Sequence, residues 1–140
     1  MNYAMDASAM IAFAAAEPGG TVVEELLADP RNRCFAHAAN LCEVYYDACR
    51  RIGPAGADQL ISDLASSGLG FRPDMYPAFW QQAGRLKAEL RRISLADCFG
   101  LVPAATVGAE FVTADRHEME APTARYGYQI KFIRRDRSFR

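Results

Sequence analysis

The main clue to the fold is the segment Tyr3-Ala4-Met5-Asp6-Ala7-Ser8-Ala9-Met10-Ile11, close to the start of the chain. It opens with a short apolar run that ends in one aspartate, and a small residue, a serine and an alanine-rich stretch follow. This pattern predicts a buried strand over 3–6 that leads directly into a helix over 7–16, which Pro18-Gly19-Gly20 would stop. Asp6 would then stand at the carboxyl end of a strand, the edge at which open α/β sheets bind their ligands.

Beyond this segment, predicted strands alternate with predicted helices. The clearest helix begins at Asn40 and repeats apolar residues at steps of three and four until Gly53-Pro54 interrupts it. The alternation favours an α/β fold with a mainly parallel sheet and helices on both faces. Further strands are predicted at 34–37, 69–72, 110–113 and 129–133, and further helices at 21–28, 55–65, 76–92, 95–105 and 115–120.

Length and composition favour one soluble domain over residues 1–140. Hydrophobic residues make up 51% and charged residues 24%, a globular rather than a disordered balance. The formal net charge of −1 gives no overall basic signature for nucleic acid. No stretch approaches the roughly 20 apolar residues of a membrane helix, and the apolar residues 7–16 lack a positively charged leader. We therefore expect a cytoplasmic protein with no membrane partner.

The cysteines and histidines argue against zinc. Four cysteines form no C-x-x-C pair, and only two histidines are present. Cys42 and Cys49 lie seven residues apart, on one face of a predicted helix. We interpret all four cysteines as reduced thiols in the core of a cytosolic protein.

Three more acids, Glu43, Asp97 and Asp115, stand in settings like that of Asp6. Each has a purely structural explanation. Asp6 and Asp115 can cap the helices that follow them, and Glu43 lies near a helix start, where negative charge is favourable. Asp97 stands three residues after Ser94, which is the spacing of a capping box. No single acid therefore indicates chemistry.

The four acids together are harder to explain by capping, because the ends of parallel strands share one sheet edge. Two carboxylates about 4 Å apart repel by about 4 kcal/mol at an effective dielectric near 20. A domain has only about 5–15 kcal/mol of net stability. A converging group therefore persists best with a bound cation or a shared proton. Oxygen ligands without histidine favour Mg²⁺ or Mn²⁺ over zinc.

Four segments of the chain resemble, in order, the acidic motifs of PIN-domain ribonucleases, and most closely those of VapC-type toxins from bacterial type II toxin–antitoxin pairs. The resemblance implies a five-stranded parallel sheet and a Mg²⁺- or Mn²⁺-dependent endoribonuclease. It also implies a homodimer that a small antitoxin protein inhibits. The segments are Asp6-Ala7-Ser8, Asn40-Leu41-Cys42-Glu43-Val44-Tyr45-Tyr46, Ser94-Leu95-Ala96-Asp97-Cys98-Phe99 and Thr113-Ala114-Asp115-Arg116-His117-Glu118.

By this resemblance, the catalytic quartet is Asp6, Glu43, Asp97 and Asp115. Asp6, Asp97 and Asp115 would hold the metal, and Glu43 would complete its surroundings and steer the attacking water. Ser8 and Thr113 match the family's usual hydroxyl positions and would support the site. Some family members carry one more acid after the fourth motif, but we interpret Glu118 as a capping residue.

Contacts to RNA phosphates would have to come from the rim, because an acidic pocket repels a polyanion. Arg85, Arg91 and Arg116 are the RNA-binding candidates, although basic residues on a helix are commonly just a solvated face. Lys87, Arg92 and the C-terminal arginines are further candidates. Trp80, Phe79 and Tyr76 are expected to pack a helix against the domain, and His117 to lie on the surface.

Three other functions compete with the nuclease. A non-catalytic PIN-like module would bind RNA or a protein without cutting, and loss of one acid would favour it. A phosphatase with an aspartyl nucleophile at Asp6 would need a second aspartate two residues later, where Ser8 stands. A phosphorylated receiver domain would need an acidic pair before Asp6, and none is present.

Overall fold

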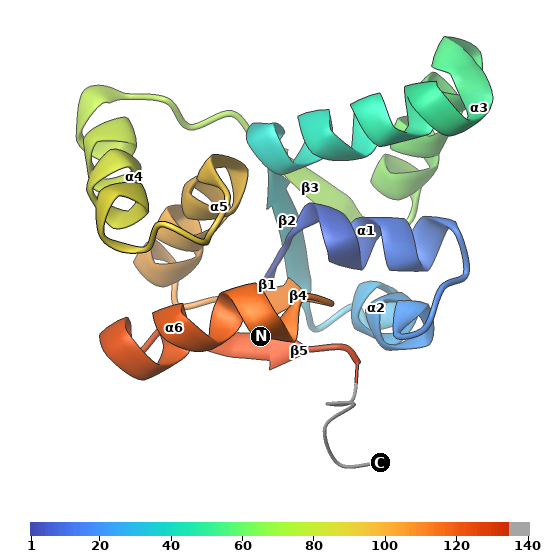
Figure 1. The fold of residues 1–140 in the computed structure, drawn as a ribbon. Helices are drawn as coiled ribbons and strands as arrows, with labels where there is room; N and C mark the ends of the chain where they lie inside the picture. The colour runs from blue at the N-terminus through green and yellow to red at the C-terminus, as the bar shows by residue number, and fades with distance from the viewer. Residues whose placement is uncertain (135–140) are drawn as a thin grey trace.

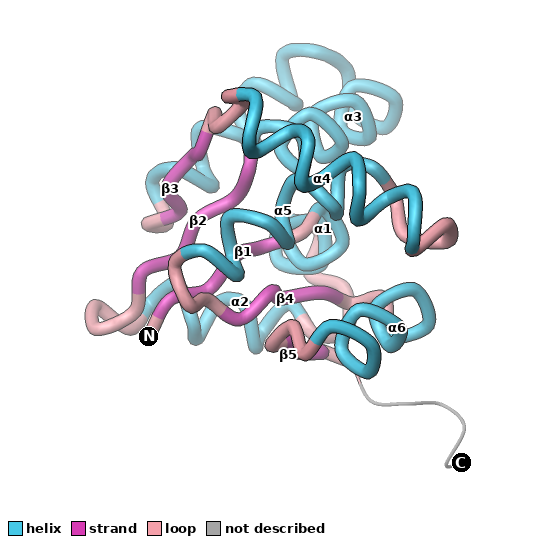
Figure 2. Tube along the Cα trace, turned by 90° about the vertical axis from the view of Figure 1, so that its left-hand side faces the viewer, coloured by secondary structure: helices cyan, strands magenta, loops and turns pink. Residues whose placement is uncertain are grey.

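The computed structural model describes residues 1–134, apart from the side chains of residues 121–124. Five strands form one sheet in the order β3-β2-β1-β4-β5, and every neighbouring pair is parallel. Figures 1 and 2 show this sheet with helices on both sides. The strands are β1 (Asn2–Met5), β2 (Arg33–His37), β3 (Leu69–Arg72), β4 (Glu110–Thr113) and β5 (Ile130–Phe132). The helices are α1 (Ala7–Ala14), α2 (Gly20–Ala28), α3 (Ala38–Ser66), α4 (Pro77–Glu89), α5 (Leu95–Thr106) and α6 (Arg116–Tyr126).

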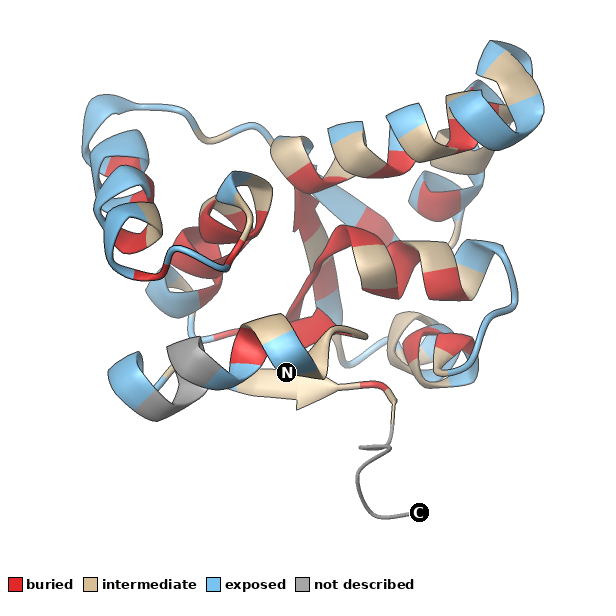
Figure 3. Ribbon diagram, viewed as in Figure 1, coloured by how far each residue is buried: buried red, intermediate tan, exposed pale blue. Residues whose placement is uncertain are grey.

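The sheet separates the core into two layers. Successive side chains of its central strand β1 point to opposite faces of the sheet and so enter different layers. Tyr3 and Met5 belong to the apolar cluster under α1, α2 and α3. Ala4 belongs to the cluster under α4 and α5, together with Phe111 of β4. Figure 3 shows buried residues gathered where the helices meet the sheet. The predicted parallel α/β fold is confirmed.

The largest differences from the predicted helices are at α3 and α6. The break expected at Gly53-Pro54 is a kink within α3, where Gly53 has φ 81° and ψ 167°, and the hydroxyl of Tyr45 donates to Asp58 across the kink at 2.7 Å. The turn predicted over 115–120 is wrong in length, because α6 continues to Tyr126 and buries Met119 completely. None of the helices within residues 1–134 is both long and apolar enough to cross a membrane.

The prediction that all cysteines are core thiols is wrong in part. Cys34 and Cys98 are buried, whereas Cys49 is half-buried and Cys42 is exposed. The reason lies in the buried stripe of α3, which includes Val44 and Ala48 and leaves Cys42 on the outer side. All four are free thiols.

Close packing at Gly100 of α5 gives a first testable prediction. A Cβ there would lie 2.6 Å from Cε2 of Phe111 and 2.7 Å from Oδ1 of Asn40. We expect Gly100→Ala to lower the free energy of unfolding by about 1–3 kcal/mol, the usual cost of overpacking a core. Urea denaturation followed by circular dichroism measures it. Gly84→Ala is the control, because Gly84 of α4 faces open space, so alanine there should stabilise the helix by up to about 1 kcal/mol. Equal losses in both variants would contradict the packing argument.

Candidate functional site

The carboxyl ends of β1 and β4 open into a pocket of about 180 Å³. The four acids from the four motifs all line it, although up to 109 residues separate them along the chain. Glu118 lines it too, so five carboxylates share one small space. The full lining is Asp6, Ala7, Ser8, Glu43, Ser94, Asp97, Asp115 and Glu118.

Asp6 is buried, with 3% of its surface exposed, and it caps α1. Its Oδ1 accepts hydrogen bonds from the Ser8 hydroxyl at 2.7 Å and from the Ala9 amide at 2.9 Å. Its Oδ2 accepts one from the Thr113 hydroxyl at 2.5 Å. Burial raises the pKa of Asp6 to about 6, although these hydrogen bonds lower it, and Asp115 adds a smaller upward push. The local sequence therefore both caps a helix and presents a carboxylate.

Ser8 follows β1 and Thr113 ends β4, and hydrogen bonds of their hydroxyls connect the carboxyl ends of these two strands. Besides donating to Asp6, the Ser8 hydroxyl accepts a hydrogen bond from the Ala114 amide at 2.9 Å. The Thr113 hydroxyl likewise accepts a hydrogen bond from the Asp115 amide at 3.0 Å. Each hydroxyl uses both its donor and its acceptor, so the orientation of the Asp6 carboxylate is fixed from the start of α1 and from the end of β4.

Asp97 lies in the first turn of α5 and is 7% exposed. The Ser94 hydroxyl accepts a hydrogen bond from the backbone amide of Asp97 at 3.1 Å, which confirms the predicted cap at Ser94. The side-chain amide of Asn40 donates to its Oδ1 at 3.3 Å. Burial is the main reason that the pKa of Asp97 rises to about 8, and the negative charges of Asp6 and Glu43 raise it further. The pocket therefore disfavours a full set of ionised carboxylates.

The remaining acids form the outer part of the pocket. Burial raises the pKa of Glu43, and Glu118 raises it further. Asp115 caps α6 by accepting the Glu118 amide at 3.0 Å. The Glu118 side chain lines the pocket, where burial and Asp115 raise its pKa. The sequence alone could not identify Glu118 as a pocket residue. An acid that caps a helix and an acid that lines the pocket can both stand three residues after Asp115.

None of the basic candidates Arg85, Arg91 and Arg116 lines the pocket. Arg85 and Arg91 are exposed on and after α4. The guanidinium of Arg116 lies 4.2 Å from the ring centre of Phe132 and donates to the carbonyl of Arg134 at 3.4 Å. Lys87 is near enough to lower the pKa of Glu118. The roles of Arg85, Arg91 and Arg116 in RNA binding stay predictions, and the C-terminal Arg135, Arg137 and Arg140 lie outside the described residues.

The chemistry of the lining residues fits a hard divalent cation. All of its charged groups are carboxylates, and the negative charges of Asp6 and Glu43 both raise the pKa of Asp97. Such oxygen-only sets suit Mg²⁺ or Mn²⁺. As placed, no three His, Cys, Asp or Glu groups in the described part of the chain stand close enough to hold an ion together. A bound cation would therefore have to draw these repelling side chains inward.

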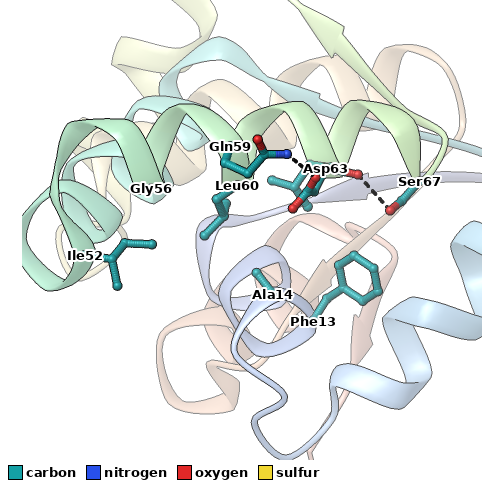
Figure 4. A pocket seen from close by; sticks show the side chains of 9 residues that line it. Phe13, Ala14, Ile52, Gly56, Gln59, Leu60, Asp63 and Ser67 are labelled. Carbon is teal, nitrogen blue, oxygen red and sulfur yellow. Dashed lines mark hydrogen bonds between the residues drawn. The ribbon is translucent and has the colours of Figure 1, made fainter.

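A second hollow lies between α1 and the later half of α3 (Figure 4), with a volume of about 480 Å³. Phe13, Ile52 and Leu60 give it apolar walls. One side is polar, where Gln59 donates to Asp63 at 2.8 Å. Ile52 is 55% exposed, so this groove leaves apolar surface open to solvent.

Comparison with known families finds a match to the PIN domain over residues 3–122. No curated protein matches the sequence significantly. The match confirms the resemblance seen in the four motifs.

Solved structures share the fold at low sequence identity. VapBC-1 from nontypeable Haemophilus influenzae is 18% identical with a TM-score of 0.68, and the match covers 95% of this chain and 98% of that chain. VapBC2 from Rickettsia felis, bound to a promoter DNA fragment, is 18% identical with a TM-score of 0.69, covering 94% and 98%. VapC20 from Mycobacterium tuberculosis, described as a sarcin-ricin loop cleaving toxin, is 17% identical with a TM-score of 0.65, covering 85% and 94%. The fold is therefore shared over most of the chain.

Proposed function

The chain belongs to the PIN-domain family, and we propose that it is a metal-dependent endoribonuclease, the toxin of a VapBC-type toxin–antitoxin pair. The observation that carries this proposal is the convergence of Asp6, Glu43, Asp97 and Asp115 in one pocket. VapC20, a structural neighbour, is described as cleaving RNA of the sarcin-ricin loop. We infer that residues 1–140 act as one domain, in the cytoplasm.

Each residue of the pocket has a proposed role. Asp6, Asp97 and Asp115 hold Mg²⁺ or Mn²⁺, which when bound supplies polarisation of a phosphate oxygen and a lower pKa for water. Ser8 and Thr113 keep the Asp6 carboxylate oriented through their hydroxyls. The Glu43 carboxylate accepts a hydrogen bond from the attacking water and aligns it with the phosphorus.

RNA would be held by cations at the rim, which position the phosphates without reading the sequence. Lys87 is near enough to lower the pKa of Glu118, and Arg85, Arg91 and Arg116 are the other candidates. Contacts of this kind weaken steeply as salt increases, because phosphate binding releases counterions.

The experiment that tests the function is cleavage of total cellular RNA by the purified chain, with new ends mapped by sequencing. We expect discrete cleavage sites in Mg²⁺ or Mn²⁺ and none when a chelator is present. Cleavage that persists in the chelator would refute the proposed dependence on a metal ion. RNA binding without any cleavage would favour the non-catalytic PIN-like module instead.

The proposed partners are an antitoxin and a second copy of the chain. VapBC structures from Haemophilus influenzae and Salmonella typhimurium are neighbours of this fold. The apolar groove beside α3 in Figure 4 offers a surface to such a partner. An arginine from the antitoxin could also enter the acidic pocket and replace the charge of the metal. A structure of the inhibited complex in which the antitoxin leaves pocket and rim untouched would exclude that arginine.

A further inference from the structure

Asn40 is the least expected residue next to the pocket. It lies in α3 one helical turn before Glu43, and none of its surface is exposed. Asparagine is a poor helix former and a costly residue to bury, because its amide can make four hydrogen bonds. An apolar residue would suit a buried helix position better, so the amide calls for an explanation.

The surroundings of Asn40 show what its amide does. Its Nδ2 donates to Oδ1 of Asp97, 57 residues away, at 3.3 Å. With Asp97 ionised, as a bound cation requires, the reverse orientation of the amide would set its oxygen against the carboxylate. Its own Oδ1 has no hydrogen-bond partner and lies against the backbone of Gly100, where a Cβ would approach it to 2.7 Å. The amide therefore serves Asp97 while its own carbonyl stays unsatisfied.

This bond joins parts of the pocket that the sheet does not join. Ser8 and Thr113 already link Asp6 and Asp115 through the ends of β1 and β4. Asp97 and Glu43 instead stand on two separate helices, α5 and α3. A hydrogen bond from Asn40 to Asp97 ties these helices together one turn away from Glu43.

A half-satisfied buried amide contributes little to stability, because burying its carbonyl without a hydrogen-bond partner is costly. We propose that Asn40 is a positioning residue, whose buried amide fixes the Asp97 carboxylate so that it and Glu43 face the same divalent cation. This inference rests on the proposed nuclease function. Asn40 touches neither the cation nor the RNA and acts only through Asp97.

The test replaces Asn40 with leucine, which has the same number and branching of side-chain heavy atoms but no polar group. Mn²⁺ is titrated into the metal-free chain by calorimetry, without RNA. We expect Mn²⁺ affinity to fall about 10–100-fold, the usual cost of losing a residue that orients a metal ligand. The kcat of RNA cleavage should fall at low Mn²⁺ and recover as Mn²⁺ is raised, while KM for RNA stays unchanged. Asn40→Ala is the second variant, should leucine prevent folding.

The matched control is Asn32→Leu. Asn32 is half-buried before β2, at the opposite edge of the sheet, and donates to the Leu26 carbonyl at 3.1 Å. This variant should lose stability but keep Mn²⁺ affinity. If Asn40→Leu and Asn40→Ala bind Mn²⁺ and cleave RNA as the parent does, the positioning role is overturned and the nuclease stands. If the parent itself neither binds Mn²⁺ nor cleaves, the nuclease proposal falls and the role of Asn40 falls with it.

Discussion

Replacing Asp6 by asparagine is expected to lower RNA cleavage by more than about a hundredfold, beyond the 10–100-fold loss typical of residues that only orient a ligand. Asp6 is the most buried carboxylate of the pocket and is oriented by three hydrogen bonds. Asparagine keeps the shape and one acceptor oxygen, so the cap of α1 should survive. It removes the negative charge, and a neutral amide oxygen binds a divalent cation more weakly than a carboxylate does.

Initial rates of RNA cleavage measure this effect, and thermal unfolding followed by circular dichroism shows that the variant is folded. Asp47→Asn makes a suitable control, because Asp47 pairs with Arg51 one turn later on α3 at 2.8 Å and is part of no pocket lining described here. Its exposed ion pair should contribute less than about 1 kcal/mol. Full activity in Asp6→Asn would remove Asp6 from the catalytic quartet.

Without divalent metal, the free energy of unfolding is expected to fall by a few kcal/mol between about pH 5 and about pH 8. The pKa of Asp6 is raised to about 6 and that of Asp97 to about 8, from a usual value of 3.8. In this window the folded chain binds more protons than the unfolded chain, so rising pH removes stability. Asp29 and Asp74, whose pKa values are lowered, change charge only below it.

Urea denaturation across this pH range, in a chelator and in Mg²⁺, measures the effect. Mg²⁺ should stabilise most at high pH, where the carboxylates are ionised, and by about 2.7 kcal/mol at a hundred times its dissociation constant. Asp97→Asn should flatten the pH dependence in the chelator, because the group with the most strongly raised pKa is gone. Stability that rises with pH in the metal-free chain would contradict the repulsion within the pocket.

Much of the fold follows from local patterns. The strands at 69–72 and 110–113 were predicted with the bounds of β3 and β4, because short apolar runs are flanked there by glycine or helix-start signals. The cap at Ser94 was also readable, since its spacing to Asp97 is local. Gly53-Pro54 gave the position of the interruption in α3, although the predicted break is a kink within one helix.

Features that depend on distant contacts could not be predicted in this way. Asn40 looked like an ordinary helix start, because its partner Asp97 is 57 residues away. Glu118 was interpreted as a capping residue from the sequence, whereas in the structure its side chain lines the pocket. The burial of Met119 in α6 could not be predicted either, because neighbouring residues give no clue to it.

The pairing of β1 with β4 has a consequence for how the protein is made. Tyr3 pairs with Glu110, so the pairing of β1 with β4 cannot form until β4 has left the ribosome. A nascent chain that stops before Glu110 lacks Thr113 and Asp115 and has no finished pocket. The proposed nuclease would therefore have no complete acidic pocket until β4 and Asp115 have been synthesised.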